Sequence, residues 1–139
     1  MSLHFDSRVL MKKAMKQHIL VVDDEAPIRD VLSGYFEKHG YLVTTASTGS
    51  DALRLANEVP INLIVLDIAL ADADGLELLE ALKAAHPNLP ILILTGMGFD
   101  EELLQEARRK GANGYVSKQL PLDQLLMEVV RALKYNKTS

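Results

Sequence analysis

The 139-residue sequence contains no cysteine, no long apolar run and no excess of basic residues. Without cysteine the chain forms neither disulfides nor thiolate metal sites, which is consistent with a cytoplasmic protein. No apolar run approaches the ~20 residues of a transmembrane helix. The net charge is −4 and the pI is near 5.5, which excludes the basic surface that nucleic acid binding requires. We therefore expect a protein that binds neither nucleic acid nor a membrane directly.

The composition, 48% hydrophobic and 24% charged, is that of a globular protein with one domain of ordinary size. Residues 1–16 differ from the rest, because they carry four basic residues and one acid. A signal peptide is excluded, since the apolar run that follows, 19–22, is too short. We interpret residues 1–16 as an N-terminal extension, in part a cloning remnant if the natural chain starts at Met11.

Five short apolar segments recur along the rest of the chain. Several are nearly continuous in valine, isoleucine and leucine, which is typical of strands covered on both faces. The segments are HILVVD (18–23), YLVTTA (41–46), INLIVLD (61–67), PILILT (90–95) and NGYVSK (113–118).

Amphipathic segments follow these strands. Apolar residues at helical spacing predict a helix with Pro27 in its first turn and Gly40 beyond its end. The clearest apolar stripe, 122–133, is opened by Pro121. Further helices are predicted around 52–59, 76–82 and 103–107. This alternation predicts a doubly wound α/β domain, with a five-stranded parallel sheet in the order 2-1-3-4-5 and five helices on its two faces.

Polar residues stand where the predicted strands end. In a doubly wound sheet the ligand site lies outside the carboxyl ends of the strands, where the strand order reverses. The first strand ends in Asp23 and Asp24, the third in Asp67, the fourth in Thr95 and the fifth in Lys118. We expect the three acids to converge, with the hydroxyl and the ammonium beside them.

This combination of side chains has few chemical uses. Three converging carboxylates raise one another's pKa unless a cation compensates them. Mg²⁺, or Mn²⁺ in its place, takes carboxylates, waters and a phosphate oxygen. An aspartate can itself act as a nucleophile and form an aspartyl-phosphate, and metal, ammonium and hydroxyl then neutralise the phosphoryl oxygens. The strand ends therefore predict a metal site that holds a phosphoryl group.

The motifs VVDDE, LIVLDIALADADGLELL, ILILTG and GANGYVSK, in this order, resemble the receiver domain of two-component response regulators. The resemblance covers residues 17–136 and leaves a tail at 137–139. It implies a flavodoxin-like (CheY-like) fold and a cytoplasmic phosphorelay module that catalyses its own phosphorylation and dephosphorylation.

The resemblance also implies a role for each polar residue at the strand ends. Asp67 corresponds to the phosphoacceptor, Asp24 to the direct metal ligand and Asp23 to the acid that acts through water. Thr95 corresponds to the hydroxyl that follows the phosphoryl group, and Lys118 to the lysine that binds it.

Two further residues and the partners follow from the same resemblance. Ala69 would offer its backbone carbonyl to the metal, and Tyr115 corresponds to the switch aromatic. The implied phosphodonor is a phosphohistidine of a sensor histidine kinase or phosphotransfer protein, since none of this chain's own histidines resembles such a site. Phosphorylation would reshape the face of the fourth helix, fifth strand and fifth helix, which could also form a homodimer.

The sequence departs from the family at two loop positions. Ala71 stands four residues after the phosphoacceptor, where the family usually has proline, and we expect it to affect loop stiffness and little else. Gln119 replaces the cis proline that usually follows the lysine. Because a non-proline cis bond costs ~2.5–4 kcal/mol, the sequence leaves open the path of this loop and the direction of the Lys118 side chain. Pro121 is interpreted as the first residue of the last helix.

Simpler interpretations compete with several of these assignments. Asp72 and Asp74 suggest a calcium loop, but the chain lacks the other ligands, and Asp74 with Glu77 forms the pattern of a helix start. Glu25 is interpreted only as an acid favoured at a helix start. The glycines of GMGFDE (96–101) are interpreted as a mobile loop beside Thr95 rather than a phosphate-binding loop.

Three functions remain open from the sequence. The first is the phosphorylated receiver, either a single-domain regulator or a receiver from a longer protein. The second is a pseudo-receiver that binds partners without phosphorylation, for which Gln119 is the main argument. The third is another enzyme or cofactor binder on the same fold, although DDEAP lacks both the glycine-rich loop of a flavin site and the D-x-D of a dehalogenase-type phosphatase.

Overall fold

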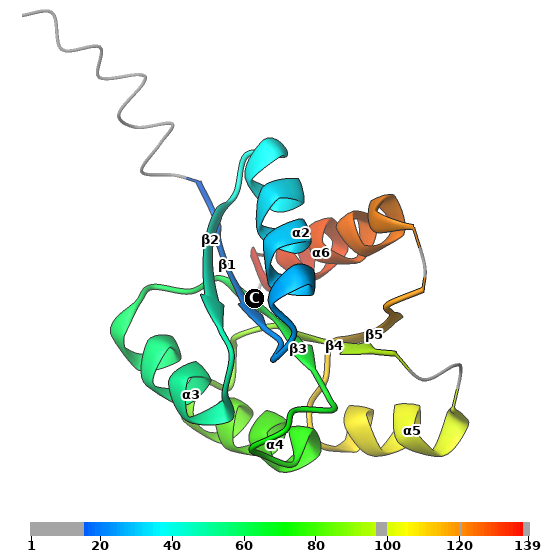
Figure 1. Cartoon of the computed structure of the whole chain (residues 1–139). Helices are drawn as coiled ribbons and strands as arrows, with labels where there is room; N and C mark the ends of the chain where they lie inside the picture. Colours follow the sequence, from blue (N-terminus) through cyan, green and yellow to red (C-terminus); the bar gives the residue numbers. More distant parts are fainter. Residues whose placement is uncertain (1–15, 97–99, 120, 138–139) are drawn as a thin grey trace, which may run out of the picture.

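The structure is a computed structural model that describes residues 16–96, 100–119 and 121–137. Its centre is a five-stranded parallel sheet in the order β2-β1-β3-β4-β5, which confirms the predicted topology (Figure 1). The strands are β1 (His18–Val22), β2 (Leu42–Ala46), β3 (Leu63–Asp67), β4 (Ile91–Thr95) and β5 (Gly114–Ser117).

A helix follows each strand within the described residues. Helices α2 and α6 cover one face of the sheet, and α3, α4 and α5 cover the other (Figure 1). The helices are α2 (Ala26–Lys38), α3 (Gly49–Glu58), α4 (Gly75–Ala85), α5 (Glu101–Arg109) and α6 (Leu122–Lys137). Among these described helices, none is both long and apolar enough to cross a bilayer.

The three central strands are apolar on both faces because helices bury both faces. In β1, Leu20 and Val22 contribute to the core under α3, α4 and α5, while Ile19 and Val21 contribute to the core under α2 and α6. Each of these four residues is 0% exposed. The continuous apolar runs of the sequence are therefore explained by the two-sided burial of the sheet.

The helix ends follow the signals in the sequence, with one shift. Asp74 caps α4 as predicted, since its Oδ1 accepts hydrogen bonds from the backbone N–H groups of Leu76 at 2.9 Å and Glu77 at 3.4 Å. The last helix begins at Leu122 rather than at Pro121. Pro121 instead precedes it and accepts the Gln124 N–H at its carbonyl, so the predicted start was wrong by one residue.

The end of α2 explains Gly40. Helix α2 ends at Lys38, and Gly40 has a φ of 93°, a backbone conformation that glycine adopts at low cost. The following Tyr41 N–H then donates to the Phe36 carbonyl at 3.1 Å. This arrangement closes the helix and starts the path into β2.

Candidate functional site

The site lies at the carboxyl ends of β1, β3, β4 and β5, with β1 and β3 adjacent at the point where the strand order reverses. Asp23, Asp67 and Thr95 are buried, with exposed fractions of 0%, 2% and 1%. Asp24 is exposed. Carboxylate oxygens of Asp23, Asp24 and Asp67 lie within 4.8 Å of one another. The acids therefore converge as the sequence predicted.

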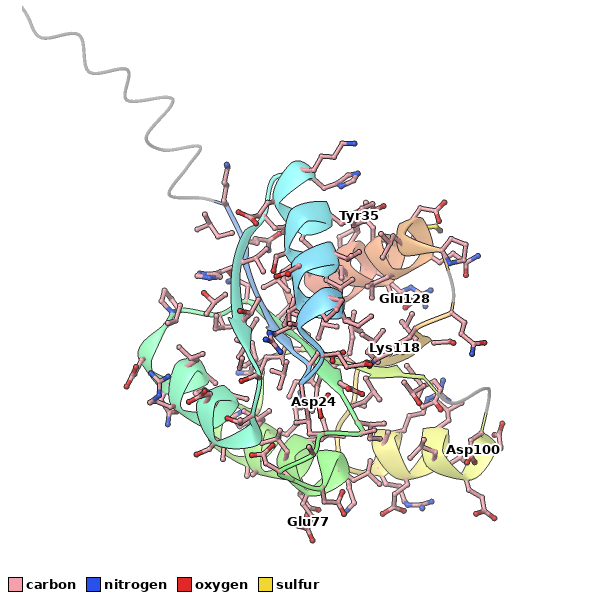
Figure 2. All side chains as sticks on the ribbon, viewed as in Figure 1. Asp24, Tyr35, Glu77, Asp100, Lys118 and Glu128 are labelled. Carbon is pink, nitrogen blue, oxygen red and sulfur yellow. The ribbon has the colours of Figure 1, made fainter. Side chains whose placement is uncertain are left out.

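Lys118 joins three of the carboxylates of this site. Its Nζ lies 2.9 Å from Asp23 Oδ2, 3.0 Å from Glu25 Oε2 and 3.1 Å from Asp67 Oδ2. Figure 2 shows Lys118 and Asp24 at the same end of the sheet, where β1 and β5 end. Burial by itself lowers the pKa of Lys118, but its contacts with the three carboxylates outweigh burial and raise the pKa. The side chain is therefore a charged ammonium at neutral pH.

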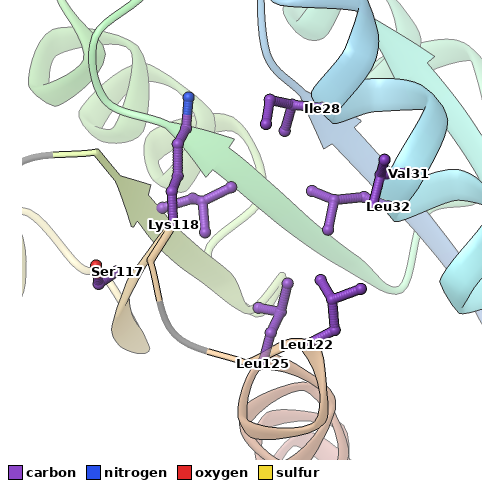
Figure 3. Close-up of a pocket in the computed structure, with 8 residues that line it drawn as sticks. Ile28, Val31, Leu32, Ser117, Lys118, Leu122 and Leu125 are labelled. Carbon is purple, nitrogen blue, oxygen red and sulfur yellow. The ribbon is translucent and has the colours of Figure 1, made fainter.

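The stem of Lys118 lines an apolar cavity of about 130 Å³ between α2 and α6. Ile28 and Val31 of α2 and Leu122 and Leu125 of α6 also line it. Figure 3 shows the nitrogen end of Lys118 turned away from Leu122 and Leu125. The lysine thus places its methylene groups among apolar side chains and its charge among the acids.

Burial raises the pKa of Asp23, and nearby Asp67 raises it further. The Glu25 N–H, which donates to Asp23 Oδ1 at 2.8 Å, and the Lys118 ammonium offset part of this rise. Asp23 Oδ2 is buried, and its contact with Lys118 Nζ lacks the alignment of a hydrogen bond. A buried oxygen with unused acceptor capacity in an all-carboxylate cluster fits a hard cation such as Mg²⁺.

The loop between β3 and α4 orients two of the acids with its backbone. The Ala69 N–H donates to Asp67 Oδ1 at 3.1 Å, and the Ala71 N–H donates to Asp24 Oδ2 at 3.0 Å. The role of the Ala69 carbonyl as a metal ligand stays a prediction. Ala71 does more than change loop stiffness, because it bonds directly to an acid of the site.

Glu25 has a larger role in the site than the sequence analysis assigned to it. It stands at the N-cap of α2, but its side chain makes no capping hydrogen bond. Its carboxylate instead accepts a hydrogen bond from Lys118 Nζ at 3.0 Å. The interpretation of Glu25 as only a helix-start acid was wrong, and the signal for its role was its place beside two site acids.

Lys118 contacts the acids of the site although Gln119 stands where the family usually has proline. The described residues contain no cis peptide bond, so the Lys118–Gln119 bond is trans. The Gln119 N–H donates to Ser117 Oγ at 3.1 Å, and the Lys118 N–H donates to the Thr95 carbonyl at 2.7 Å. The bond to Thr95 holds the end of β5 against β4, and the bond to Ser117 closes the turn that follows β5.

Tyr115 lies deeper in the sheet than the charged residues. It pairs with Ile93 in the register of β4 and β5, as Ser117 pairs with Thr95, so it shares a face of the sheet with Thr95. Its ring is half-buried against the core under α3, α4 and α5. Within the described part of the chain, its hydroxyl is buried without a hydrogen-bond partner.

We expect Tyr115→Phe to keep the stability of the protein or to increase it by up to about 1 kcal/mol, because a buried unpaired hydroxyl carries a desolvation cost. Urea denaturation monitored by circular dichroism measures the change. A loss of more than about 1 kcal/mol would show that the hydroxyl has a partner in solution.

The raised pKa of Asp23 predicts a pH-dependent effect of Asp23→Asn in the metal-free protein. The folded state holds the Asp23 proton more tightly than the unfolded chain does. The stability that this carboxyl contributes is therefore complete below its unfolded pKa of about 3.9 and is lost as the pH rises through the folded pKa.

Asp23→Asn should consequently gain stability relative to the parent as the pH rises from about 4 to about 7. Thermal unfolding of both proteins in EDTA measures the difference, and any constant cost of the amide cancels in its pH dependence. A difference that is flat or declines with pH would contradict the raised pKa.

Two predicted segments extend beyond the described residues. They are residues 97–99 of the predicted GMGFDE loop and residues 1–15 of the N-terminal extension.

The described histidines form hydrogen bonds away from the acidic site. His18 bonds with Thr44, His39 with Tyr35 and His86 with Asn57. None of these histidines belongs to the acidic cluster.

The fold and the site together define a flavodoxin-like α/β domain with an acidic centre at its switch point. Residues 19–130 match the family of the response regulator receiver domain, and the chain belongs to this family. Membership favours a receiver over a flavin protein or a dehalogenase-type phosphatase.

Individual relatives agree with the family match. The nitrogen assimilation regulatory protein NtrX of Azorhizobium caulinodans is 38% identical over 123 residues, which cover 86% of this chain and 27% of that protein. The receiver domain of NtrX from Brucella abortus has a TM-score of 0.78 at 38% identity, covering 84% of this chain and 98% of that one. A CheY-like receiver domain protein from Methanospirillum hungatei has a TM-score of 0.84 at 29% identity, covering 88% and 98%.

The chain spans about a quarter of the length of the curated relatives that it matches, with coverage of 25% and 27% for two of them. The similarity therefore concerns their receiver portion.

Proposed function

We propose that this chain is the phosphoacceptor module of a two-component response regulator. Asp67 receives the phosphoryl group from a phosphohistidine of a sensor histidine kinase or phosphotransfer protein, in a reaction that depends on Mg²⁺. The observation that carries the proposal is the position of Lys118 Nζ, 3.1 Å from Asp67 Oδ2 and 2.9 Å from Asp23 Oδ2, beside an acidic cluster that fits a divalent cation.

In the transfer step, a carboxylate oxygen of Asp67 attacks the phosphorus, the phosphorus–nitrogen bond breaks, and the imidazole leaves with the electron pair of that bond. Asp67 is prepared for the attack because the Ala69 N–H and the Lys118 ammonium hold its two oxygens. Lys118 then stabilises charge on the phosphoryl oxygens. Asp67 is only 2% exposed, and this burial limits the access of water to the aspartyl-phosphate.

Asp23, Asp24, Asp67 and the carbonyl of Ala69 would hold the metal. When bound there, Mg²⁺ supplies a Lewis acid that neutralises phosphoryl charge. The same residues and Lys118 would serve hydrolysis of the aspartyl-phosphate, in which water attacks the phosphorus, the bond between phosphorus and the Asp67 oxygen breaks, and Asp67 leaves as a carboxylate while inorganic phosphate is released.

The output of the proposed switch runs through Thr95 and Tyr115 to the face formed by α5, β5 and α6. Thr95 ends β4 beside β5, and Tyr115 lies on the same face of the sheet. A phosphoryl group shifts this face only if it binds the active conformation better than the inactive one. The same face is the proposed surface for a homodimer.

The pseudo-receiver alternative was based on Gln119. Lys118 Nζ nevertheless lies 3.1 Å from Asp67 Oδ2 with a trans bond before Gln119. The departure from proline therefore does not misplace the lysine, and the geometry supports the phosphorylated receiver.

The proposal is tested by intact mass spectrometry after incubation with a small-molecule phosphodonor and Mg²⁺. We expect one phosphoryl group that is labile to hydroxylamine, and no gain in Asp67→Asn or in EDTA. Asp30→Asn is the matched control, because Asp30 is an exposed carboxylate on α2 outside the acidic cluster. If the protein binds Mg²⁺ but is phosphorylated neither by the small-molecule donor nor by a histidine kinase, it is instead a pseudo-receiver.

A further inference from the structure

The two loop positions that usually carry proline in receivers carry N–H groups in this chain, and both groups are hydrogen-bonded. The Ala71 N–H donates to Asp24 Oδ2 at 3.0 Å, and the Gln119 N–H donates to Ser117 Oγ at 3.1 Å. Proline has no N–H and can make neither bond. Ala71 is the more informative position, because its partner is an acid of the site.

Asp24 is otherwise weakly held. It is exposed, whereas Asp23 and Asp67 are buried. Lys118 forms ion pairs with Asp23, Glu25 and Asp67, and Asp24 is not among its partners in the described structure. Orientation of the Asp24 carboxylate therefore depends on the Ala71 N–H.

The Ala71 N–H is itself fixed by the rest of its loop. On one side, the Ala69 N–H is bonded to Asp67 Oδ1. On the other side, both carboxylate oxygens of Asp72 accept the Gly49 N–H at 3.1 Å, at the start of α3, and Asp74 caps α4. Because the loop is anchored at both ends, the amide orients the carboxylate instead of following it.

We propose that Ala71 is a positioning residue whose N–H orders Asp24 in advance for a divalent cation, and that this raises the affinity of the chain for Mg²⁺. This inference depends on the proposed function, because it requires Mg²⁺ at the acidic cluster. The N–H does not block the cation, since a carboxylate has about four lone-pair positions. An exposed side chain that is already ordered loses less conformational freedom when the metal binds.

Isothermal titration of the full chain with MgCl₂ tests the proposal in the parent, Ala71→Pro and Ala71→Ser. Loss of a hydrogen bond to a metal ligand typically weakens metal binding ~10–100-fold, and we expect Ala71→Pro to bind Mg²⁺ about ten-fold more weakly than the parent. Ala71→Ser retains the N–H and should stay within about two-fold, well below the effect of a lost ligand partner.

Equal Mg²⁺ affinity of Ala71→Pro and the parent would overturn the inference and leave the proposed function intact. If the parent itself binds no Mg²⁺, the proposed function fails together with the inference. Weakening of both variants to the same extent would also overturn the inference, because the effect would then follow the side chain and not the N–H.

A second measurement does not require the proline variant to fold. In the metal-free parent, NMR should show the Ala71 amide protected from solvent exchange, and Asp24→Ala should accelerate its exchange by about ten-fold. Exchange at the same rate in both proteins would show that the bond is absent in solution and would overturn the inference.

Discussion

Replacing Lys118 with methionine should lower the free energy of unfolding of the metal-free protein by about 3 kcal/mol at neutral pH. The substitution leaves Asp23 and Asp67, at 0% and 2% exposure, without their shared cation. Removing one partner of a buried ion pair leaves an uncompensated buried charge, which is the costly case. Methionine keeps an apolar stem along the cavity between α2 and α6, so the lost stability measures the effect of removing the positive charge.

Urea denaturation in EDTA measures this effect. Lys134→Met is the matched control, because Lys134 is exposed on α6, and its substitution should change stability by less than about 0.5 kcal/mol. Added Mg²⁺ should restore part of the stability of Lys118→Met, since a ligand that binds only the folded state stabilises it. Lys118→Met with parental stability in EDTA would show that the acids do not depend on the lysine.

Gly75→Ala should lower the free energy of unfolding by a similar amount, for a steric reason. An added Cβ would lie 2.2 Å from the carbonyl oxygen of Ile68 and 2.6 Å from its Cα, and neither backbone atom can rotate away. Because Ile68 directly follows Asp67, relief of the clash moves the site as well as α4. We expect a loss of about 3 kcal/mol, the upper part of the range for overpacking, and slower phosphorylation of Asp67.

Gly34→Ala is the control for this substitution. Gly34 lies inside α2, and apart from its chain neighbours and the backbone of its own helix, no atom of the described residues would lie within 4 Å of a Cβ there. Alanine should therefore stabilise the helix by about 0.5–1 kcal/mol. If Gly75→Ala were as stable as Gly34→Ala, the close approach of α4 to Ile68 would be absent in solution.

The sheet and the acidic cluster were predictable because their signals are local. Continuous apolar runs identify strands buried on both faces, and the residues that end these runs must meet at one edge of a parallel sheet. Asp23, Asp67 and Lys118 could thus be placed together from their positions at strand ends. The resemblance to receivers then supplied roles that spacing alone leaves open.

Contacts between distant segments could not be predicted in the same way. Glu25 and Lys118 are 93 residues apart, and their hydrogen bond depends on side-chain paths that no local pattern encodes. The bonds of Ala71 and Gln119 use backbone N–H groups, which nearly every residue has. The only signal for them in the sequence was negative, namely that proline was missing where the family usually has it.

The location of the phosphoryl group is the most direct test of Asp67 as the phosphoacceptor. Parent protein incubated with phosphodonor and Mg²⁺ would be reduced with borohydride, which converts an aspartyl-phosphate to homoserine, and then digested and sequenced by mass spectrometry. We expect homoserine at position 67 alone, and none in EDTA. A stable phosphoryl group on Thr95, homoserine at another aspartate, or an unmodified Asp67 in protein that binds Mg²⁺ would contradict the proposed function.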